Sequence, residues 1–260
     1  MSDVPILDDC EPFAHDAGDV GTGVLVLHGF TGNPSSMRLQ AHGVAEAGHH
    51  VEQPRLPGHG TSVDDMLSTD WSHWSGEALA AYDRLAERAD RIVISGLSMG
   101  GTLALFTGLE RAADGRLCGL VCVNPAAAHE APDRRQMLVE LLDAGTTVIP
   151  GIGSDIADPD VAEIAYDGTP VAPLLSLIDA KSQIADRYGE LVVPRLLFTS
   201  QDDHVVPPDQ SEHLAATYGA GDGALVDHVW LERSYHVATQ DYDRDLITER
   251  MLEFVGRVTE

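Results

Sequence analysis

Positive charge is scarce in this chain of 260 residues. There are 16 basic residues against 42 acidic ones, which gives a formal net charge of −26 at pH 7. Lys181 is the only lysine, and the other basic residues are arginines. Because nucleic acids and anionic lipids attract basic surfaces, this balance argues against both as partners. The acidic residues are spread along the whole sequence and do not form a tail.

A folded domain with this charge should repel itself in dilute buffer. In molar salt the Debye length falls to about 3 Å, and the repulsion is screened. Distributed acidity with almost no lysine resembles the proteins of halophiles whose cytoplasm holds concentrated potassium chloride. We therefore expect a halophilic protein, a property that concerns solubility and habitat and leaves the chemistry open.

Cysteines and long apolar runs are also few. Cys10, Cys118 and Cys122 form an odd set without C-x-x-C spacing, which argues against a disulfide framework or a zinc site and suits a reducing cytoplasm. No run of about 18 apolar residues predicts a membrane span, and the first ten residues lack the basic and apolar regions of a secretory signal. We expect a cytoplasmic protein without stable membrane insertion.

The stretch Arg91–Gly101 contains the first chemical signature. Ile92, Val93 and Ile94 predict a short buried strand, and Thr102–Leu109 predicts a helix. Between them, G-L-S-M-G matches G-x-S-x-G, in which glycines allow a sharp turn that exposes the serine. Ser98 is therefore the candidate nucleophile. The N–H of Met99 would lie at the helix N-terminus, where it can stabilise an oxyanion.

A second signature follows an expected strand at Val24–His28. The chain continues into Gly29-Phe30, and the Phe30 N–H can complete an oxyanion hole with that of Met99. His28 could act as a general base, but a histidine at this place more often holds the loop by hydrogen bonds. We favour the structural role for His28.

The remaining pattern predicts an α/β fold with a mostly parallel, doubly wound sheet. Residues 1–20 are expected to form an arm or a short first strand. Further strands are expected at His50–Glu52, Leu117–Val123, Arg195–Thr199 and Leu225–Leu231. Helices are expected up to Ala47 with Ser35 or Ser36 as cap, from Trp71 to Arg88 with Asp70 as cap, up to Tyr218 with Asp209 as cap, and from Tyr242 to Val258.

Residues 126–190 break this alternation and predict an insertion. Helices are expected at Met137–Leu142, Asp158–Ile164 and Val171–Arg187, with an irregular stretch at Thr146–Gly153. About sixty residues are too many for an ordinary crossover. We expect a cap at 126–190 that covers the serine, with residues 1–125 and 191–260 forming the core.

The late part of the chain offers an acid and a base. Asp202 and Asp203 follow the expected strand at Arg195–Thr199, and His236 follows the last strand. The chain order serine, acid, histidine is the one found on α/β-hydrolase sheets. In such a triad the histidine takes the proton of the serine, and the acid fixes the histidine tautomer. Position alone does not separate Asp202 from Asp203.

The chain resembles the α/β-hydrolase superfamily and, more narrowly, its small bacterial carboxylesterases and monoacylglycerol lipases. The resemblance covers nearly the full length, is weakest over residues 126–190, and is carried by the motifs L-V-L-H-G-F-T-G-N (25–33), L-P-G-H-G (56–60), Asp70-Trp71, G-L-S-M-G-G (96–101), D-H-V-V-P-P (203–208) and S-Y-H-V (234–237). It implies Asp203 as the acid, because the family's acid is followed by one residue and then a hydrophobic pair. The histidine loop of this branch usually reads S-G-H or S-x-H, and Tyr235 is a tolerable variant of it.

The resemblance implies hydrolysis of carboxylic esters without a metal or organic cofactor. We expect a serine carboxylesterase that acts on short- to medium-chain esters or monoacylglycerols as small-molecule substrates. A thioesterase, an acyltransferase or a carbon–carbon hydrolase would use the same triad. A ligand receptor that retains the triad is the alternative from another class. A dehalogenase or epoxide hydrolase is disfavoured, because its nucleophile would be an aspartate.

Overall fold

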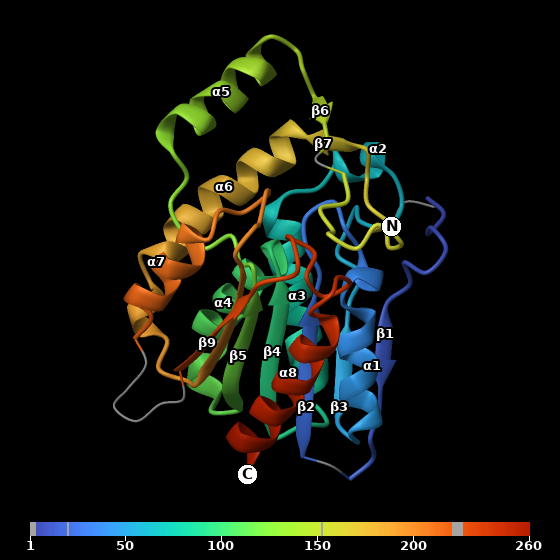
Figure 1. The fold of residues 1–260 in the computed structure, drawn as a ribbon, viewed down its shortest axis with the longest axis vertical. Helices are drawn as coiled ribbons and strands as arrows, with labels where there is room; N and C mark the ends of the chain where they lie inside the picture. The colour runs from blue at the N-terminus through green and yellow to red at the C-terminus, as the bar shows by residue number, and fades with distance from the viewer. Residues whose placement is uncertain (1–3, 20, 152, 220–225) are drawn as a thin grey trace.

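A twisted sheet of seven strands forms the centre of the computed structural model, which describes residues 4–19, 21–151, 153–219 and 226–260 (Figure 1). The spatial order is β1-β3-β2-β4-β5-β8-β9. Only β1 runs antiparallel to its neighbour, β3; the other neighbours are parallel. The strands are β1 (Phe13–His15), β2 (Thr22–Leu27), β3 (His50–Gln53), β4 (Arg91–Leu97), β5 (Leu117–Val123), β8 (Arg195–Ser200) and β9 (Val226–Leu231). The predicted α/β class is confirmed.

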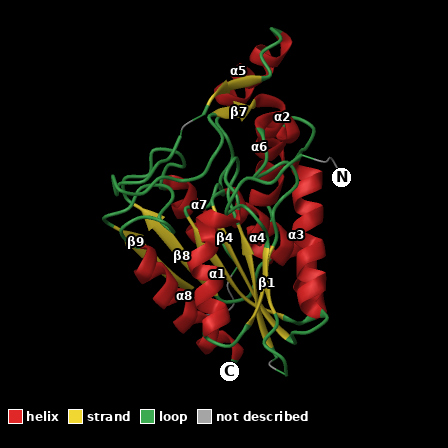
Figure 2. Cartoon of the chain, turned by 90° about the vertical axis from the view of Figure 1, so that its right-hand side faces the viewer, coloured by secondary structure: helices red, strands yellow, loops and turns green. Residues whose placement is uncertain are grey.

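The central strands are apolar on both faces because helices cover both faces. On one side, Leu25 and Leu27 of β2 share a core with α3 (Trp71–Ala86) and α4 (Met99–Arg111). On the other, Val24 and Val26 share a core with α1 (Arg38–Glu46) and α8 (Arg244–Thr259). Figure 2 shows the sheet between these helices. The period-2 alternation of strand side chains sends successive residues of β2 into opposite cores.

The remaining helices are short or belong to the outer part of the molecule. They are η1 (Pro34–Met37), α2 (Val63–Met66), η2 (Ala112–Asp114), α5 (Pro132–Asp143), α6 (Val171–Ala185), η3 (Tyr188–Glu190) and α7 (Asp209–Thr217). No helix within the described ranges has both the length and the apolar composition that a membrane crossing requires.

Two expected helix caps are wrong. Asn33, and neither Ser35 nor Ser36, caps the first helical turn, because its side chain accepts the Ser35 N–H at 2.9 Å. Asp209 is the first residue of α7, and its side chain makes no capping hydrogen bond. Asp70 does cap α3 and accepts the N–H groups of Ser72 and His73.

The inserted segment, residues 126–190, lies over the carboxyl ends of the parallel strands (Figure 1). It contains α5, α6 and a small antiparallel pair of β6 (Val148–Pro150) and β7 (Gly168–Pro170). The stretch 146–153 was expected to be irregular, but β6 lies within it. The strand expected at Leu225–Leu231 is β9, although Leu225 lies outside the described residues.

No helix forms at Asp158–Ile164, contrary to expectation. The stretch contains turns and extended chain, and its N–H groups are used elsewhere. The Asp158 N–H donates to the carboxylate of Asp241 at 3.1 Å, and the Asp160 N–H donates to the side chain of Asp158 at 3.1 Å. The Glu163 N–H donates to Ser154 Oγ at 3.0 Å. Of these donors only the Glu163 N–H would need a carbonyl partner within a helix, because the first four N–H groups of a helix have none. The side chain of Ser154 takes this donor.

Candidate active site

Ser98 stands on a strained turn between β4 and α4. Its φ is +56° and its ψ −119°, a backbone region that side-chain-bearing residues rarely adopt. The turn is so tight that a Cβ added at Gly96 would lie 2.1 Å from the Gly100 carbonyl oxygen. A Cβ added at Gly100 would lie 2.1 Å from the Leu27 carbonyl oxygen. These glycines therefore let the chain turn and hold the serine above the strand ends.

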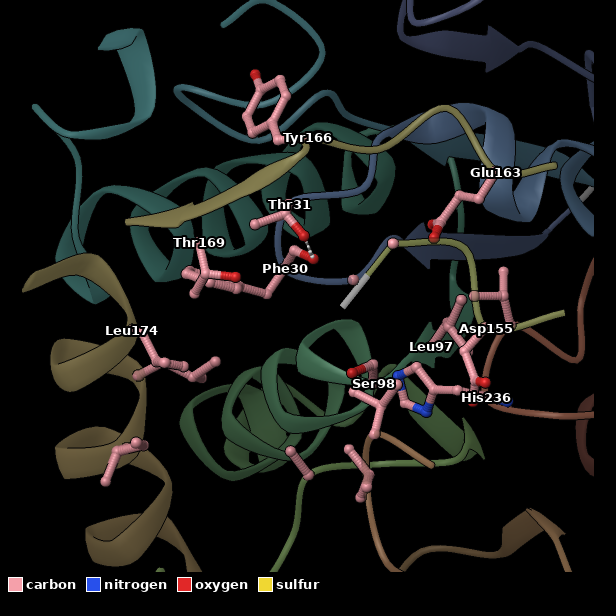
Figure 3. Close-up of a pocket in the computed structure, with 18 of the residues that line it drawn as sticks. Phe30, Thr31, Leu97, Ser98, Asp155, Glu163, Tyr166, Thr169, Leu174 and His236 are labelled. Atoms are coloured by element: carbon pink, nitrogen blue, oxygen red, sulfur yellow. Dashed lines mark hydrogen bonds between the residues drawn. The ribbon is translucent and has the colours of Figure 1, made fainter. Parts of the chain in front are cut away.

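The side chain of His236 lies beside that of Ser98 (Figure 3). Its ring also contacts the carboxylate of Asp203. His236 Nδ1 donates to Asp203 Oδ2 at 2.7 Å. The other oxygen, Oδ1, accepts the N–H groups of Val205 and Val206, each at 2.8 Å. The side chain of Asp203 is 1% exposed and that of His236 is 7% exposed, whereas Asp202 is an exposed residue. The structure brings Asp203, and not Asp202, to the histidine.

The loop after β2 passes directly over the serine. A Cβ added at Gly29 would lie 3.4 Å from the Ser98 Cβ. The next residue, Phe30, lines the same pocket as Ser98. The Met99 N–H lies at the first position of α4, where helix donors have no partner within the helix. The two residues whose amides are expected to form the oxyanion hole, Phe30 and Met99, thus lie in the pocket wall and next to Ser98 in the chain, respectively.

His28 uses both ring nitrogens for the loop. Its Nδ1 donates to the Gly29 carbonyl at 2.9 Å, and its Nε2 accepts the Leu56 N–H at 3.1 Å. Complete burial, aided by the nearby His59, keeps the pKa of His28 well below its ordinary value. A neutral ring with both nitrogens engaged supports the loop, in agreement with the structural role favoured for His28.

The histidine loop is held by Asn124, whose role was not foreseen. Asn124 follows β5 with a φ of +44°. Its Nδ2 donates to the His236 carbonyl at 2.8 Å and to Ser200 Oγ at 3.0 Å, and its Oδ1 accepts the Ser200 N–H at 2.8 Å. The only signal in the sequence was its position at a strand end, before Pro125.

Two aspartates connect the inserted segment to the histidine loop, and both escaped the sequence analysis. Asp155 Oδ2 accepts the His236 N–H at 3.1 Å and the His204 N–H at 3.2 Å, while Oδ1 contacts His204 Nδ1 at 2.8 Å. Asp241 is completely buried. Its carboxylate accepts the N–H groups of Ala157 at 2.7 Å and Tyr235 at 2.9 Å. One carboxylate therefore binds both segments.

A cavity of about 250 Å³ opens above the serine, between the sheet and the inserted segment (Figure 3). Its wall is mostly apolar and is formed by residues that include Leu97, Leu174, Leu177, Ile178, Val205, Val206 and Val237. Charged side chains line it at Glu130, Arg134, Asp155, Glu163 and Lys181. An apolar pocket with a few polar groups is the usual form of a small-molecule site.

Glu163 carries a carboxyl group that points into this cavity (Figure 3). Desolvation raises the pKa of Glu163 to about 7, although the nearby His236 opposes the shift. The carboxyl group of Glu163 also lies close to the loop after β2: a Cβ added at Gly32 would be only 2.9 Å from Glu163 Oε1. The pocket therefore contains a carboxyl that can be protonated near neutral pH.

The parallel sheet, the serine turn and the histidine–aspartate pair at the strand ends define the α/β-hydrolase class. A family model described as "Serine aminopeptidase, S33" matches residues 19–243, and the chain belongs to this family.

The similarity to known proteins extends over nearly the whole chain. The chain is 40% identical to a protein of Bacillus sp. (strain H-257) named thermostable monoacylglycerol lipase, over 97% of both chains. A solved structure described with LipS and LipT, two metagenome-derived lipolytic enzymes, is 39% identical, with a TM-score of 0.90 over 97% of this chain and all of that one. The Paleococcus ferrophilus monoacylglycerol lipase, 17% identical, has the same fold, with a TM-score of 0.72 over 94% and 98% of the two chains.

Proposed function

We propose that this chain is a serine carboxylesterase that hydrolyses short- to medium-chain carboxylic esters or monoacylglycerols. The observation that carries the proposal is the pair of His236 and Asp203, 2.7 Å apart, with His236 beside Ser98 in an apolar pocket (Figure 3). Relatives named lipase, at 39–40% identity over nearly the whole chain, support the same reaction class.

The reaction runs in two steps. His236 takes the proton of Ser98 as its oxygen attacks the ester carbonyl, and the protonated ring then gives the proton to the departing alcohol. In the second step His236 activates water, which releases the acid from the acyl-enzyme. Asp203 keeps the proton of the ring on Nδ1, so that Nε2 is free to accept from the serine.

The N–H groups of Phe30 and Met99 stabilise the negative oxygen of both tetrahedral species. They are fixed by the loop after β2 and by the start of α4, so little reorganisation is needed when charge develops. Loss of one such donor typically lowers kcat about 100- to 1000-fold.

The pocket suggests which part of an ester lies where. The residues of α6 offer an apolar wall to the acyl chain, and Glu163 offers a hydrogen-bonding group to an alcohol that carries further hydroxyls, as glycerol does. The inserted segment, residues 126–190, serves as the cap of this pocket, on a core formed by residues 1–125 and 191–260.

The charge and the cysteines suggest the setting in which the enzyme works. The net charge of −26 with a single lysine suits a cytoplasm rich in potassium chloride. Cys10, Cys118 and Cys122 are all free thiols, which suits a reducing compartment. The proposal is therefore a halophilic, cytoplasmic esterase.

The test is hydrolysis of p-nitrophenyl esters, from acetate to decanoate, and of 1-monoacylglycerols in molar potassium chloride. The wild type should turn over both, and Ser98→Ala should abolish turnover. Ser95→Ala is the matched control, because Ser95 is buried in β4, the strand that leads to Ser98, and its hydroxyl has no partner among the described residues. Hydrolysis of amino-acid p-nitroanilides but not of esters, or no turnover by a folded wild type, would refute the proposal.

A further inference from the structure

The only lysine of the chain lines the pocket. Lys181 lies on α6 with its side chain 7% exposed, and its Nζ lies 2.9 Å from Glu130 Oε2. Every other cationic side chain in the sequence is an arginine, and the arginine ion pairs of α5, α6 and their surroundings are largely exposed. A residue type that the sequence otherwise avoids is thus retained at a buried position in the site.

Lys181 interrupts an otherwise apolar wall. Leu174, Leu177, Ile178 and Lys181 follow one another at helical spacing and line the same cavity. At 1.5 Å per residue, Lys181 lies about 10 Å along the helix from Leu174. Along α6, the wall of the cavity therefore presents three aliphatic side chains and, next in the chain, a charge.

Glu130 reaches the same end of the cavity from the other side. The Ala126 N–H lies 3.5 Å from the Ser98 carbonyl oxygen, and Glu130 follows four residues later. Four residues span at most about 14 Å, so the ion pair and the serine belong to one continuous pocket. Ala126, Glu130 and Lys181 all line it.

Neighbouring groups fix the ion pair in place. Arg134 Nη1 lies 3.4 Å from Glu130 Oε1, and Lys181 Nζ donates to Gln210 Oε1 at 3.5 Å. Although burial works against ionisation, the hydrogen bond and charge of Lys181 keep the pKa of Glu130 below its ordinary value. Since a buried charge without its partner is strongly unfavourable, neither side chain can turn away from the other to admit an apolar group.

We propose that the Lys181–Glu130 ion pair is the distal end of the acyl pocket and sets the upper limit of the acyl chain length. The inference rests on the proposed esterase function and adds a specificity determinant to it. The acyl chain packs on the aliphatic wall of α6, and a chain long enough to reach residue 181 meets a fixed pair of charges.

The limit arises because methylenes that reach the ion pair no longer gain free energy from burial on an apolar wall. Each methylene buried on the aliphatic wall should raise kcat/KM about fourfold. A methylene that reaches the ion pair contacts charged groups and removes their remaining hydration, so the gain ends there. The profile of kcat/KM against chain length should rise and then stop or fall.

The experiment compares this profile, from acetate to myristate p-nitrophenyl esters, in the wild type and in Lys181→Met/Glu130→Met. The double variant leaves no unpaired buried charge, because unbranched apolar side chains of similar volume replace both buried partners. Arg134, which also contacts Glu130, is about half exposed, so its charge stays solvated. We expect its optimum to move to longer chains, with about a fourfold gain for each added methylene beyond the wild-type limit. Lys181→Arg, which keeps the cation, should keep the wild-type limit.

The matched control is Arg135→Gln/Asp179→Asn. This ion pair also joins α5 to α6, with 2.6 Å between Arg135 Nε and Asp179 Oδ1, but it is about half exposed and does not line the pocket. Its removal should leave the chain-length profile unchanged. An active double methionine variant with the wild-type optimum would overturn the inference, as would an equal shift in the control. A wild type inactive on every ester would overturn the proposed function first, and the inference with it.

Discussion

Replacing Asp203 by asparagine should trap His236 in the wrong tautomer while leaving the fold intact. Asp203 Oδ1 accepts two backbone N–H groups, from Val205 and Val206, at 2.8 Å each. An asparagine must keep its only oxygen toward these two donors, so its NH2 group would face His236 Nδ1. The ring would then accept at Nδ1 and carry its proton on Nε2, toward Ser98, where it cannot accept the serine proton.

The expected loss follows from this geometry. The equivalent change in a serine protease triad lowers kcat about 10⁴-fold, which corresponds to about 5 kcal/mol of transition-state stabilisation. Both backbone hydrogen bonds survive, and one bond to the histidine is kept with its direction reversed. The free energy of unfolding should therefore change by no more than about 2 kcal/mol.

The assay is kcat for a p-nitrophenyl ester in molar potassium chloride, with thermal unfolding measured on the same samples. Asp202→Asn is the control, because Asp202 is adjacent to Asp203 in the sequence and is exposed. A kcat above one tenth of the wild-type value in Asp203→Asn, or an equal loss in Asp202→Asn, would refute the assignment of Asp203 as the orienting acid.

Three further predictions concern the turn, the pocket carboxyl and the charge. Gly100→Ala should lower the free energy of unfolding by about 3 kcal/mol or more, because its Cβ would meet the Leu27 carbonyl at 2.1 Å. In chemical denaturation, Gly76→Ala in an open part of α3 should instead be neutral or stabilising by up to about 1 kcal/mol. Since the pKa of Glu163 is raised to about 7 in the folded protein, its contribution favours folding at low pH and is lost as the pH rises through 7. Glu163→Gln should therefore flatten the dependence of the melting temperature on pH between pH 5 and 7, whereas the exposed Glu46→Gln should not. An unchanged slope in Glu163→Gln would contradict this. Finally, the melting temperature should rise steeply between dilute buffer and 2 M potassium chloride, since −26 charges repel less when screened; an unchanged circular dichroism melting curve would speak against it.

The sheet and the serine turn could be predicted because their signals are local. The strand at Leu117–Val123 was predicted with its observed bounds, and the strand, turn and helix around Ser98 follow from the spacing of apolar residues and glycines. Buried parallel strands need uninterrupted apolar runs, and a tight turn needs glycine, so a single stretch of sequence carries enough information.

The supports of the site could not be predicted because their partners are distant in the chain. Asp155 binds the amide of His236, 81 residues away, and Asp241 binds that of Ala157, 84 residues away. Among 42 acidic residues, two more aspartates carry no local signal. The wrong helix at Asp158–Ile164 has a similar cause, because residues outside the stretch fix its backbone: Asp241 accepts the Asp158 N–H, and Ser154 accepts the Glu163 N–H that a helix would use.

Asp155 and Asp241 join residues 126–190 to the histidine loop by two sets of hydrogen bonds, and this has a consequence for the ancestry and engineering of the enzyme. Residues 155–158 and 235–242 form one hydrogen-bonded unit, so the pocket's cover is not an exchangeable module. A lineage that replaced residues 126–190 had to supply a new acceptor for the His236 amide and new donors for the Asp241 carboxylate, or lose the position of the histidine. Chimaeras between relatives should keep these two stretches from the same parent, and crossover points between them should inactivate the product even where it folds.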